Sequence, residues 1–329
     1  MSKAREQSST TGTPRRGAVV PPPTPPKFFE LIPPNPGIDF VGMAPKVAVA
    51  SILLIVIGLA TMWARGGLNY GIDFTGGTMV EVRFPSATSI ADVRASLDRP
   101  DVRSVSVQDV GGAGADFQIR AQQASDEASS VADAIKAGLK DRFGEGSYDV
   151  LRVESVGPKV GSDLWRNATL AVIASTIMMG LYIGFRFDLP VGVGAAAKLL
   201  HDVLFTLGAI SIANMEFDLT TVAALLTVVG FSVNDNVIIS DRIRESRRKN
   251  RNEPLATLVN TSINETLSRT VINSGTVVLT TATLFLLGGP VIHSFAFALL
   301  IGFLIGTVSS IFISTPIVLA LEARRTHRA

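Results

Sequence analysis

Cysteine is absent from the 329 residues, and its absence removes several kinds of chemistry. Without a thiol, the chain can form no disulfide, no thiolate metal site and no thiol nucleophile. Histidine is scarce, and no second histidine stands at ligand spacing from His201, so we expect no metal site. Phosphate-binding glycine loops and the residue sets of glycoside and acyl-transfer enzymes are also missing. The sequence predicts a protein that is not an enzyme, needs no cofactor and binds no nucleic acid.

Hydrophobic residues make up 47% of the chain, and they are concentrated in long blocks. A helix needs about 20 mostly apolar residues to cross a membrane. One of the six candidate spans, Val191–Ile212, is interrupted by Lys198, His201 and Asp202. The other five are Val47–Trp63, Ala168–Phe185, Leu219–Ser240, Val271–Leu287 and Phe295–Leu321. We therefore predict an α-helical integral membrane protein with six transmembrane helices.

The distribution of lysine and arginine predicts the orientation of these spans. Basic residues cluster in the N-terminal segment, in the loop 242–268 and in the C-terminal tail, whereas the links 213–218 and 288–292 carry none. Cytoplasmic loops carry an excess of Lys and Arg. We expect a multi-pass protein of the inner (plasma) membrane with both termini cytoplasmic. No cleavable signal fits, because the first apolar run starts after a proline-rich stretch.

The chain divides into five parts by composition. Residues 1–36 are polar and proline-rich, and we expect a disordered cytoplasmic tail. Residues 37–66 hold the first span and its entry, and 166–321 hold spans two to six. Residues 322–329 form a second cytoplasmic tail. Between the first two spans, 67–165 should form an exported domain.

The pattern within 67–165 predicts an α+β fold. Alternating apolar residues indicate strands at 78–84, 103–110, 116–121 and 147–156, and helical spacing indicates helices at 89–97 and 126–143. The order β-α-β-β-α-β is that of a ferredoxin-like domain. Outside it, a surface helix is expected near 254–265. A short repeat, Gly-Ile-Asp-Phe at 37–40 and 71–74, lies near each end of span one.

Asp235 is the most informative residue, because it lies inside the apolar span Leu219–Ser240. A carboxylate at membrane depth costs a few kcal/mol and usually marks an ion or proton path. Arg269, which enters span five, is the favoured basic partner, since Arg242 fits better as an interfacial anchor. The alternative is a permanently paired aspartate that only fixes helix packing.

Other polar and small residues in the spans fit a supporting role. Ser232, Asn234 and Asn236 lie beside Asp235 in the sequence. Lys198 and Asp202 can pair one turn apart, and His201 can carry a proton, so these three form either a packing network or a proton relay. Gly302 and Gly306 allow close helix packing.

Several motifs in order make this chain resemble the SecF branch of the SecD/SecF family, which is related to resistance-nodulation-division transporters. They cover residues 37 to 320, with the proline-rich tail outside. The matching stretches are Gly71–Thr78, Val156–Gly161, His201–Val203, Asp218–Thr227, Gly230–Asp235, Ser240–Glu245, Arg269–Thr270, Gly288–Pro290 and Gly302–Ser310. Lys198 departs from the family pattern, where an uncharged residue is usual.

The resemblance implies an accessory role in protein export. It implies SecD, the SecYEG channel and the translocating preprotein as partners, and use of the proton motive force late in translocation and release. Asp235 and Arg269 occupy the positions of the family's proposed proton-coupling pair, and sodium could replace the proton. Two rivals stay open: half of a proton-driven small-molecule or lipid exporter, and a scaffold that holds SecD at the channel.

Overall fold

The computed structural model describes residues 36–99, 102–110, 114–122 and 128–326. The predicted disordered tail therefore lies outside the described residues except for Pro36, as does the end of the C-terminal tail. Within the described ranges, six helices are long and apolar enough to cross a membrane, as predicted. They are α1 (Phe40–Ala64), α5 (Pro158–Arg186), α6 (Leu189–Ala213), α7 (Leu219–Lys249), α8 (Leu255–Leu287) and a composite sixth span.

The sixth span is not a uniform helix. It runs through α9 (His293–Ser309), the π-helical turn η2 (Ser310–Ser314) and α10 (Thr315–Thr326), after a 3-10 turn η1 (Pro290–Ile292). A π turn inside an α-helix often lies at a functional site. Here the Thr315 hydroxyl donates to the carbonyl of Ser310 at 3.1 Å, which satisfies one carbonyl of the widened turn.

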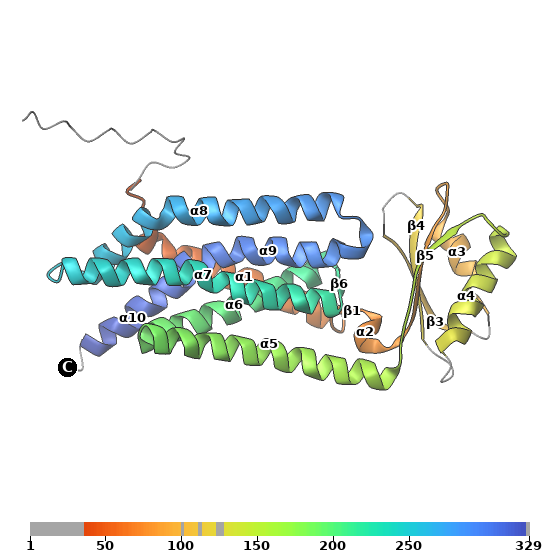
Figure 1. The fold of residues 1–329 in the computed structure, drawn as a ribbon, viewed down its shortest axis with the longest axis horizontal. Coiled ribbons are helices and arrows are strands. Elements are labelled where there is room, and N and C mark those ends of the chain that lie inside the picture. The colour runs from red at the N-terminus through yellow and green to blue at the C-terminus, as the bar shows by residue number, and fades with distance from the viewer. Residues whose placement is uncertain (1–35, 100–101, 111–113, 123–127, 327–329) are drawn as a thin grey trace, which may run out of the picture. The chain divides into compact units, whose positions relative to one another are not determined.

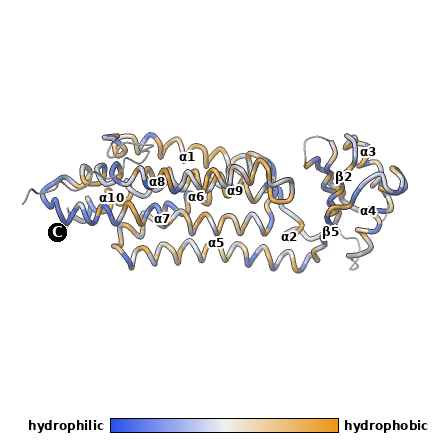
Figure 2. Tube along the Cα trace, turned by 45° about the horizontal axis from the view of Figure 1, so that its top comes forward, coloured by the Kyte–Doolittle hydropathy of each residue, from blue (hydrophilic) through white to orange (hydrophobic). Residues whose placement is uncertain are grey.

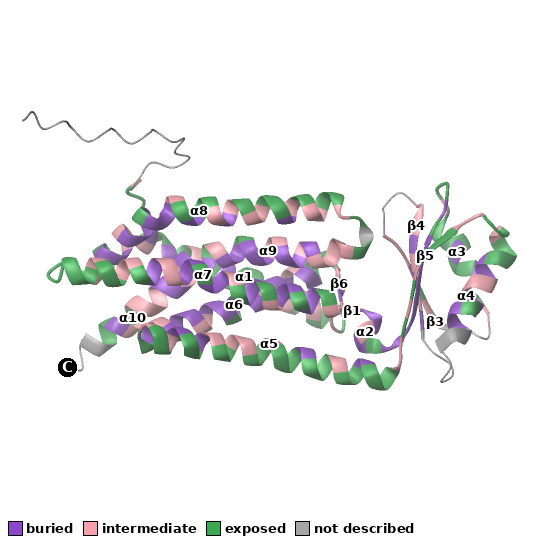
Figure 3. Cartoon of the chain, in the orientation of Figure 1, coloured by how far each residue is buried: buried purple, intermediate pink, exposed green. Residues whose placement is uncertain are grey.

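The inner helices of the bundle are α6, α7 and α9, with α5 and α8 at its outer edges (Figure 1). More than half of the apolar window is buried in α6, in α7 and in the sixth span, against 17% in α1, α5 and α8. The same contrast is visible in the burial colours of Figure 3. In Figure 2 hydrophobic residues follow the length of the helices, and hydrophilic ones gather near the C-terminal end of α10. Polar residues of α6 and α7 are thus enclosed by other helices.

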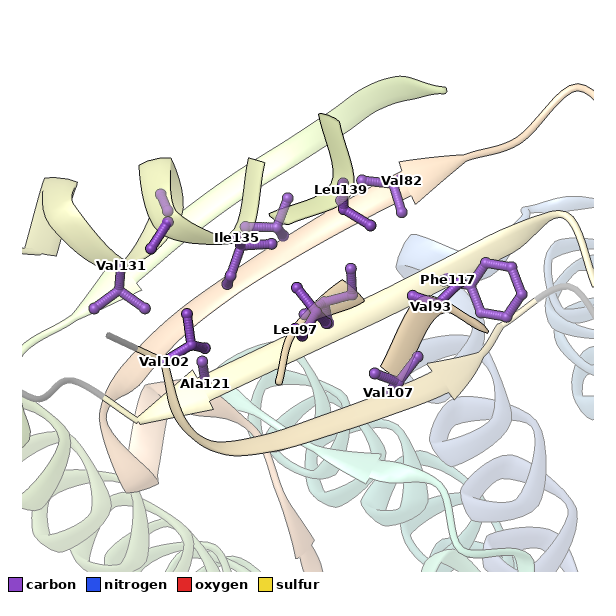
Figure 4. Close-up of a cluster of buried hydrophobic side chains, with 14 of the residues drawn as sticks. Val82, Val93, Leu97, Val102, Val107, Phe117, Ala121, Val131, Ile135 and Leu139 are labelled. Atoms are coloured by element: carbon purple, nitrogen blue, oxygen red, sulfur yellow. The ribbon is translucent and has the colours of Figure 1, made fainter. Parts of the chain in front are cut away.

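The domain between α1 and α5 has the predicted element order. It consists of β2 (Gly77–Arg83), α3 (Ile90–Ser96), β3 (Arg103–Asp109), β4 (Asp116–Gln122), α4 (Ala128–Phe143) and β5 (Asp149–Val156). The sheet order is β3-β4-β2-β5 with antiparallel pairs. Alternate residues of β2 and β4, such as Val82 and Ile119, meet Ile135 and Leu139 of α4 in a hydrophobic core (Figure 4).

Short elements join this domain to the bundle. Strand β1 (Asn69–Tyr70) pairs in parallel with β6 (Glu216–Phe217), and α2 (Ile72–Thr75) follows β1. Both aspartates of the Gly-Ile-Asp-Phe repeat bind helix N-termini: Asp39 accepts from the Gly42 amide of α1, and Asp73 from the Leu219 amide of α7, each at 2.9 Å. The repeat thus supplies free backbone N–H groups with acceptors.

Two expectations about helix boundaries were wrong. The helix expected near 254–265 is not a separate surface helix but the first part of α8, and helical structure covers most of the loop 242–268. The physical reason lies in Asn260 and Asn264, whose side-chain oxygens accept from the backbone N–H groups of Phe40 and Ile38 at the start of α1. These polar residues continue the helix by making tertiary contacts. The first span also begins seven residues earlier, at Phe40 rather than Val47.

Candidate functional site

Asp235 lies inside the bundle on α7 with 1% of its surface exposed. The Ser274 hydroxyl of α8 donates to Asp235 Oδ2 at 3.1 Å. The other carboxylate oxygen, Oδ1, is buried and has no hydrogen-bond partner among the described residues. A buried acceptor without a partner costs about 1–3 kcal/mol, and more when it is charged. A proton on this carboxylate, or a cation bound to it, would remove that cost.

Arg269 and Asp235 are not in contact. No hydrogen bond or ion pair within the described ranges joins them, and Arg269 is exposed on α8. It lines a surface hollow with Asn273 and Thr276. Ser274, which does contact Asp235, stands five residues further along α8, about 7.5 Å at helical rise. The described residues therefore show no direct Asp235–Arg269 pair, because Arg269 is exposed and Ser274 is the residue of α8 that contacts the carboxylate.

Arg242, the alternative basic partner, is engaged elsewhere. Its guanidinium donates to Glu265 at 2.6 Å and to Glu245 at 2.5 Å. Both glutamates lie near the hydrophilic end of the α7–α8 hairpin. This position fits the anchoring role that the sequence indicated for Arg242.

A second polar cluster, the Lys198 cluster, comprises Lys198, His201, Asp202, Ser232 and Ser51. The Lys198 ammonium donates to Asp202 Oδ2 at 3.1 Å and to the Ser232 carbonyl at 2.9 Å, and also contacts the Ser232 hydroxyl. The Ser232 hydroxyl donates to Asp202. His201 Nδ1 lies 3.1 Å from Asp202 Oδ1 and its Nε2 lies 2.6 Å from the Ser51 hydroxyl of α1. Lys198 and Asp202 are completely buried.

The two asparagines beside Asp235 have different surroundings. Asn236 is buried and accepts a hydrogen bond from Ser314 of η2 at 2.6 Å, which connects α7 to the π turn. Asn234 is exposed on the other side of α7. It therefore lies outside the polar network in which the sequence placed it, because neighbouring residues of a helix point in different directions.

Gly302 and Gly306 of α9 lie against α7. A Cβ at Gly302 would stand 2.2 Å from Val228, and one at Gly306 would stand 3.1 Å from the Ser232 hydroxyl. Ser232 belongs to the Lys198 cluster, so this close approach holds α9 beside the polar site.

The hydroxyl groups that complete the site were missed from the sequence. Ser274 binds Asp235, Ser314 binds Asn236 and Ser51 binds His201. Ser51 could have been noticed as a lone polar residue in the apolar stretch of α1. Serines in the more polar α8 and η2 gave no such signal. Within the described residues, no group of three or more His, Asp or Glu side chains could hold a metal ion.

Comparison with known proteins gives consistent matches along the chain. Residues 135–324 match the family "Protein export membrane protein SecD/SecF, C-terminal", and residues 63–84 match the "SecD/SecF GG Motif". The chain is 39% identical to the protein translocase subunit SecF of Vibrio alginolyticus over 91% of this chain and 95% of that protein. It is 42% identical to the subunit of the same name from Magnetococcus marinus, over 86% and 92%.

Solved structures give the same result at the level of the fold. The crystal structure of SecDF from Thermus thermophilus, described as a translocon-associated membrane protein, matches with a TM-score of 0.79 at 36% identity. The match covers 91% of this chain and 40% of the SecDF chain, so this chain spans about two fifths of that structure's length. A SecDF structure in a super-membrane-facing form matches with a TM-score of 0.64 at 37% identity.

Proposed function

Because the chain belongs to the SecD/SecF family of protein export membrane proteins, we propose that it works with a SecD subunit and the SecYEG channel on a translocating preprotein. The family consists of non-enzymatic accessory subunits of the translocase, and six apolar helices make this member a multi-pass membrane protein. A SecD partner is supported by the SecDF match, in which a chain of this length corresponds to two fifths of the whole.

The proton motive force drives the proposed action through Asp235. This is supported by the single observation that Asp235 is buried in the membrane bundle with one carboxylate oxygen unpartnered. Protonation removes the charge and lets the carboxyl group donate, whereas release of the proton restores a charge that the bundle must accommodate. Each proton crossing 100 mV supplies about 2.3 kcal/mol. That energy suits a stepwise bias of preprotein movement late in translocation.

Arg269 meets Asp235 only in another state of the proposed cycle. Arg269 lies five residues before Ser274 on α8, about 7.5 Å at helical rise, on an accessible surface beside Asn273. A small shift of α8 against α7 would bring it toward the ionised carboxylate, and protonation of Asp235 would remove that attraction. The described conformation then corresponds to the state without the pair.

The proposed orientation places both termini in the cytoplasm and residues 67–165 outside. Its support is the basic cluster of Arg244, Arg247, Arg248 and Arg251 around one hollow between α7, α8 and α10. Cytoplasmic segments carry such an excess of Arg and Lys. Sodium is the alternative driving ion, because the Ser274 hydroxyl beside Asp235 offers an oxygen ligand.

The experiment replaces Asp235 with Asn and measures preprotein export into membrane vesicles with and without a proton gradient. We expect the gradient-stimulated component to disappear while export without a gradient and recovery of the SecD complex stay unchanged. Thr227→Val is the matched control, because Thr227 is exposed on the same helix and, among the described residues, its hydroxyl bonds only to the Ala223 carbonyl.

Three other outcomes would reject the coupling role. Undiminished gradient stimulation in Asp235→Asn would show that this carboxylate does not couple the gradient. Poor recovery of the SecD complex would favour the scaffold role. Intact protein export, combined with greater drug sensitivity when the subunit is removed, would favour a small-molecule exporter. Exchanging the proton gradient for a sodium gradient in the same vesicles identifies the driving ion.

A further inference from the structure

Lys198 is a buried cation that is connected to Asp235 through Ser232 of α7. Its ammonium binds the Ser232 carbonyl at 2.9 Å and the Ser232 hydroxyl. Ser232 and Asp235 are three residues apart on α7, so their side chains share one face at about 5–6 Å between Cβ atoms. Among the described residues, Lys198 is also the only buried lysine or arginine.

The buried titratable groups around this site come from two helices. α6 supplies Lys198, His201 and Asp202, and α7 supplies Asp235. The other packed elements contribute uncharged side chains inside the bundle: Ser51 of α1, Ser274 of α8, Ser309 of α9, Ser314 of η2, and apolar residues of α5 such as Ile183. Arg269 of α8 is charged but exposed, and among the described residues it makes no hydrogen bond or ion pair with Asp235. On α10, Glu322 pairs with Arg247 at the end of α7.

His201 bridges α6 and α1. Its Nδ1 lies 3.1 Å from Asp202 Oδ1, and its Nε2 lies 2.6 Å from the Ser51 hydroxyl. The buried site therefore brings one lysine together with two carboxyl groups.

We propose that Lys198 is the resident counter-ion of the coupling site and limits its load to one proton or one monovalent cation. This inference rests on the proposed coupling function. A net charge inside a membrane bundle is expensive. With Lys198 present, one ionised carboxylate is balanced, and the second becomes acceptable only when it binds one more positive charge. Without Lys198, both carboxylates would have to bind a positive charge.

Asp235, rather than Asp202, takes the extra charge. Asp202 receives the Lys198 ammonium, the Ser232 hydroxyl and His201 Nδ1, and each of these stabilises the ionised form. Asp235 has fewer donors: the Ser274 hydroxyl binds Oδ2, Asn273 lies close enough to interact with the carboxylate, and Oδ1 has no hydrogen-bond partner among the described residues. A proton or a cation at Oδ1 would therefore neutralise Asp235 while Asp202 keeps its partners.

The test compares Asp202→Asn, Lys198→Met and the double variant Lys198→Met/Asp202→Asn, each in full-length protein with SecD. The measurement is the pH midpoint of gradient-stimulated export in vesicles. Asp202→Asn leaves Lys198 balanced by ionised Asp235, so its midpoint should move to lower pH. Lys198→Met leaves two carboxylates without a cation, so its midpoint should move to higher pH. Each shift should be about one pH unit or more, the usual effect of one close charge.

The double variant is the matched reference, because it restores the charge balance and removes the pair together. Its midpoint should lie between those of the single variants. If one of the two single variants fails to accumulate, the pH midpoint of the other must still differ from that of the double variant in the stated direction. Coincident midpoints for Asp202→Asn, Lys198→Met and the double variant would overturn the proposal. Gradient stimulation that survives in Asp235→Asn would instead overturn the proposed function itself.

Discussion

Single buried carboxylates have different roles in the two parts of this molecule. Asp235 lies in the bundle, whereas Glu81 lies in strand β2 of the small domain with 4% of its surface exposed. Glu81 Oε1 has no hydrogen-bond partner among the described residues. Burial is the largest effect on the pKa of Glu81 and raises it above the ordinary 4.5, while Arg152 nearby lowers it. The ionised form of Glu81 therefore weakens the folded domain.

Glu81→Gln should stabilise the domain at neutral pH and have no effect in acid. The pKa of Glu81 is raised in the folded state. The loss of folding stability caused by ionised Glu81 is therefore complete above the pKa of Glu81 in the folded domain. It is absent below the pKa that Glu81 has in the unfolded chain. Amide hydrogen exchange in β2 and β4 should slow in Glu81→Gln at pH 7, and the difference should vanish below about pH 4.

Arg83→Gln, on the same strand, is the opposite case and a suitable control. Arg83 binds Asp116 at 2.7 Å, and this hydrogen bond is the main cause that lowers the pKa of Asp116. The Arg83–Asp116 pair stabilises the folded domain above the pKa that Asp116 has in the unfolded chain. This stability is lost as the pH falls through the lower pKa that Asp116 has in the folded domain. Equal exchange rates in parent and Glu81→Gln at pH 7 would contradict the account of Glu81.

Helices of the bundle approach one another through glycines. A Cβ at Gly58 of α1 would lie 2.4 Å from the Gly208 backbone of α6, and one at Gly192 would lie 2.4 Å from the Gly184 backbone. Backbone cannot move aside as a side chain can, so these contacts fix the distance between helices. They hold α6, which carries Lys198 and Asp202, against both α1 and α5.

Gly58→Ala should destabilise the bundle by about 1–3 kcal/mol, the usual effect of overpacking. Gly230→Ala is the control, since a Cβ at that exposed helical position meets nothing within 4 Å. Alanine favours helix there by up to about 1 kcal/mol. Thermal unfolding in detergent should show a lower midpoint for Gly58→Ala and an equal or higher one for Gly230→Ala. Equal midpoints for Gly58→Ala and the parent would show that α1 and α6 can separate freely.

Much at the scale of elements could be predicted from the sequence, because hydrophobic blocks and alternation are local signals. They indicated six spans and the β-α-β-β-α-β order. The start of α8 was not predicted. Asn260 and Asn264 are polar and were expected on a surface helix, whereas in the structure they bind the backbone of Ile38. The exposure of Asn234 and the distance between Arg269 and Asp235 were missed as well. A sequence gives the face of a helix but not which neighbour lies opposite it.

At the scale of the whole molecule, a few polar contacts connect the small domain to the bundle. Arg120 of β4 forms an ion pair with Glu216 of β6 at 2.5 Å, and Gln118 also donates to Glu216 at 3.2 Å. Burial is the largest effect on the pKa of Glu216 and raises it, while Arg120 lowers it. This ion pair joins the sheet to the strand directly before α7, the helix that carries Asp235.

Arg120→Ala should loosen the domain on the bundle without unfolding either part. Two cysteines introduced at the exposed positions Lys140 and Leu287 can carry spin labels, because the natural chain has no cysteine. The distance distribution between the labels should broaden in Arg120→Ala. Arg142→Ala is the control, since it removes a 3.0 Å ion pair to Asp92 within the domain. Equal broadening in both variants would show that the Arg120–Glu216 pair does not restrain the domain.

The most direct measurement concerns the proton on Asp235. Infrared difference spectra between acidic and alkaline pH detect the C=O band of a protonated carboxyl group in full-length protein in lipid. We predict a band that appears on acidification, is lost in Asp235→Asn and persists in Thr227→Val. A band that is unchanged in Asp235→Asn would contradict the claim that this buried carboxylate loads and releases the coupling proton.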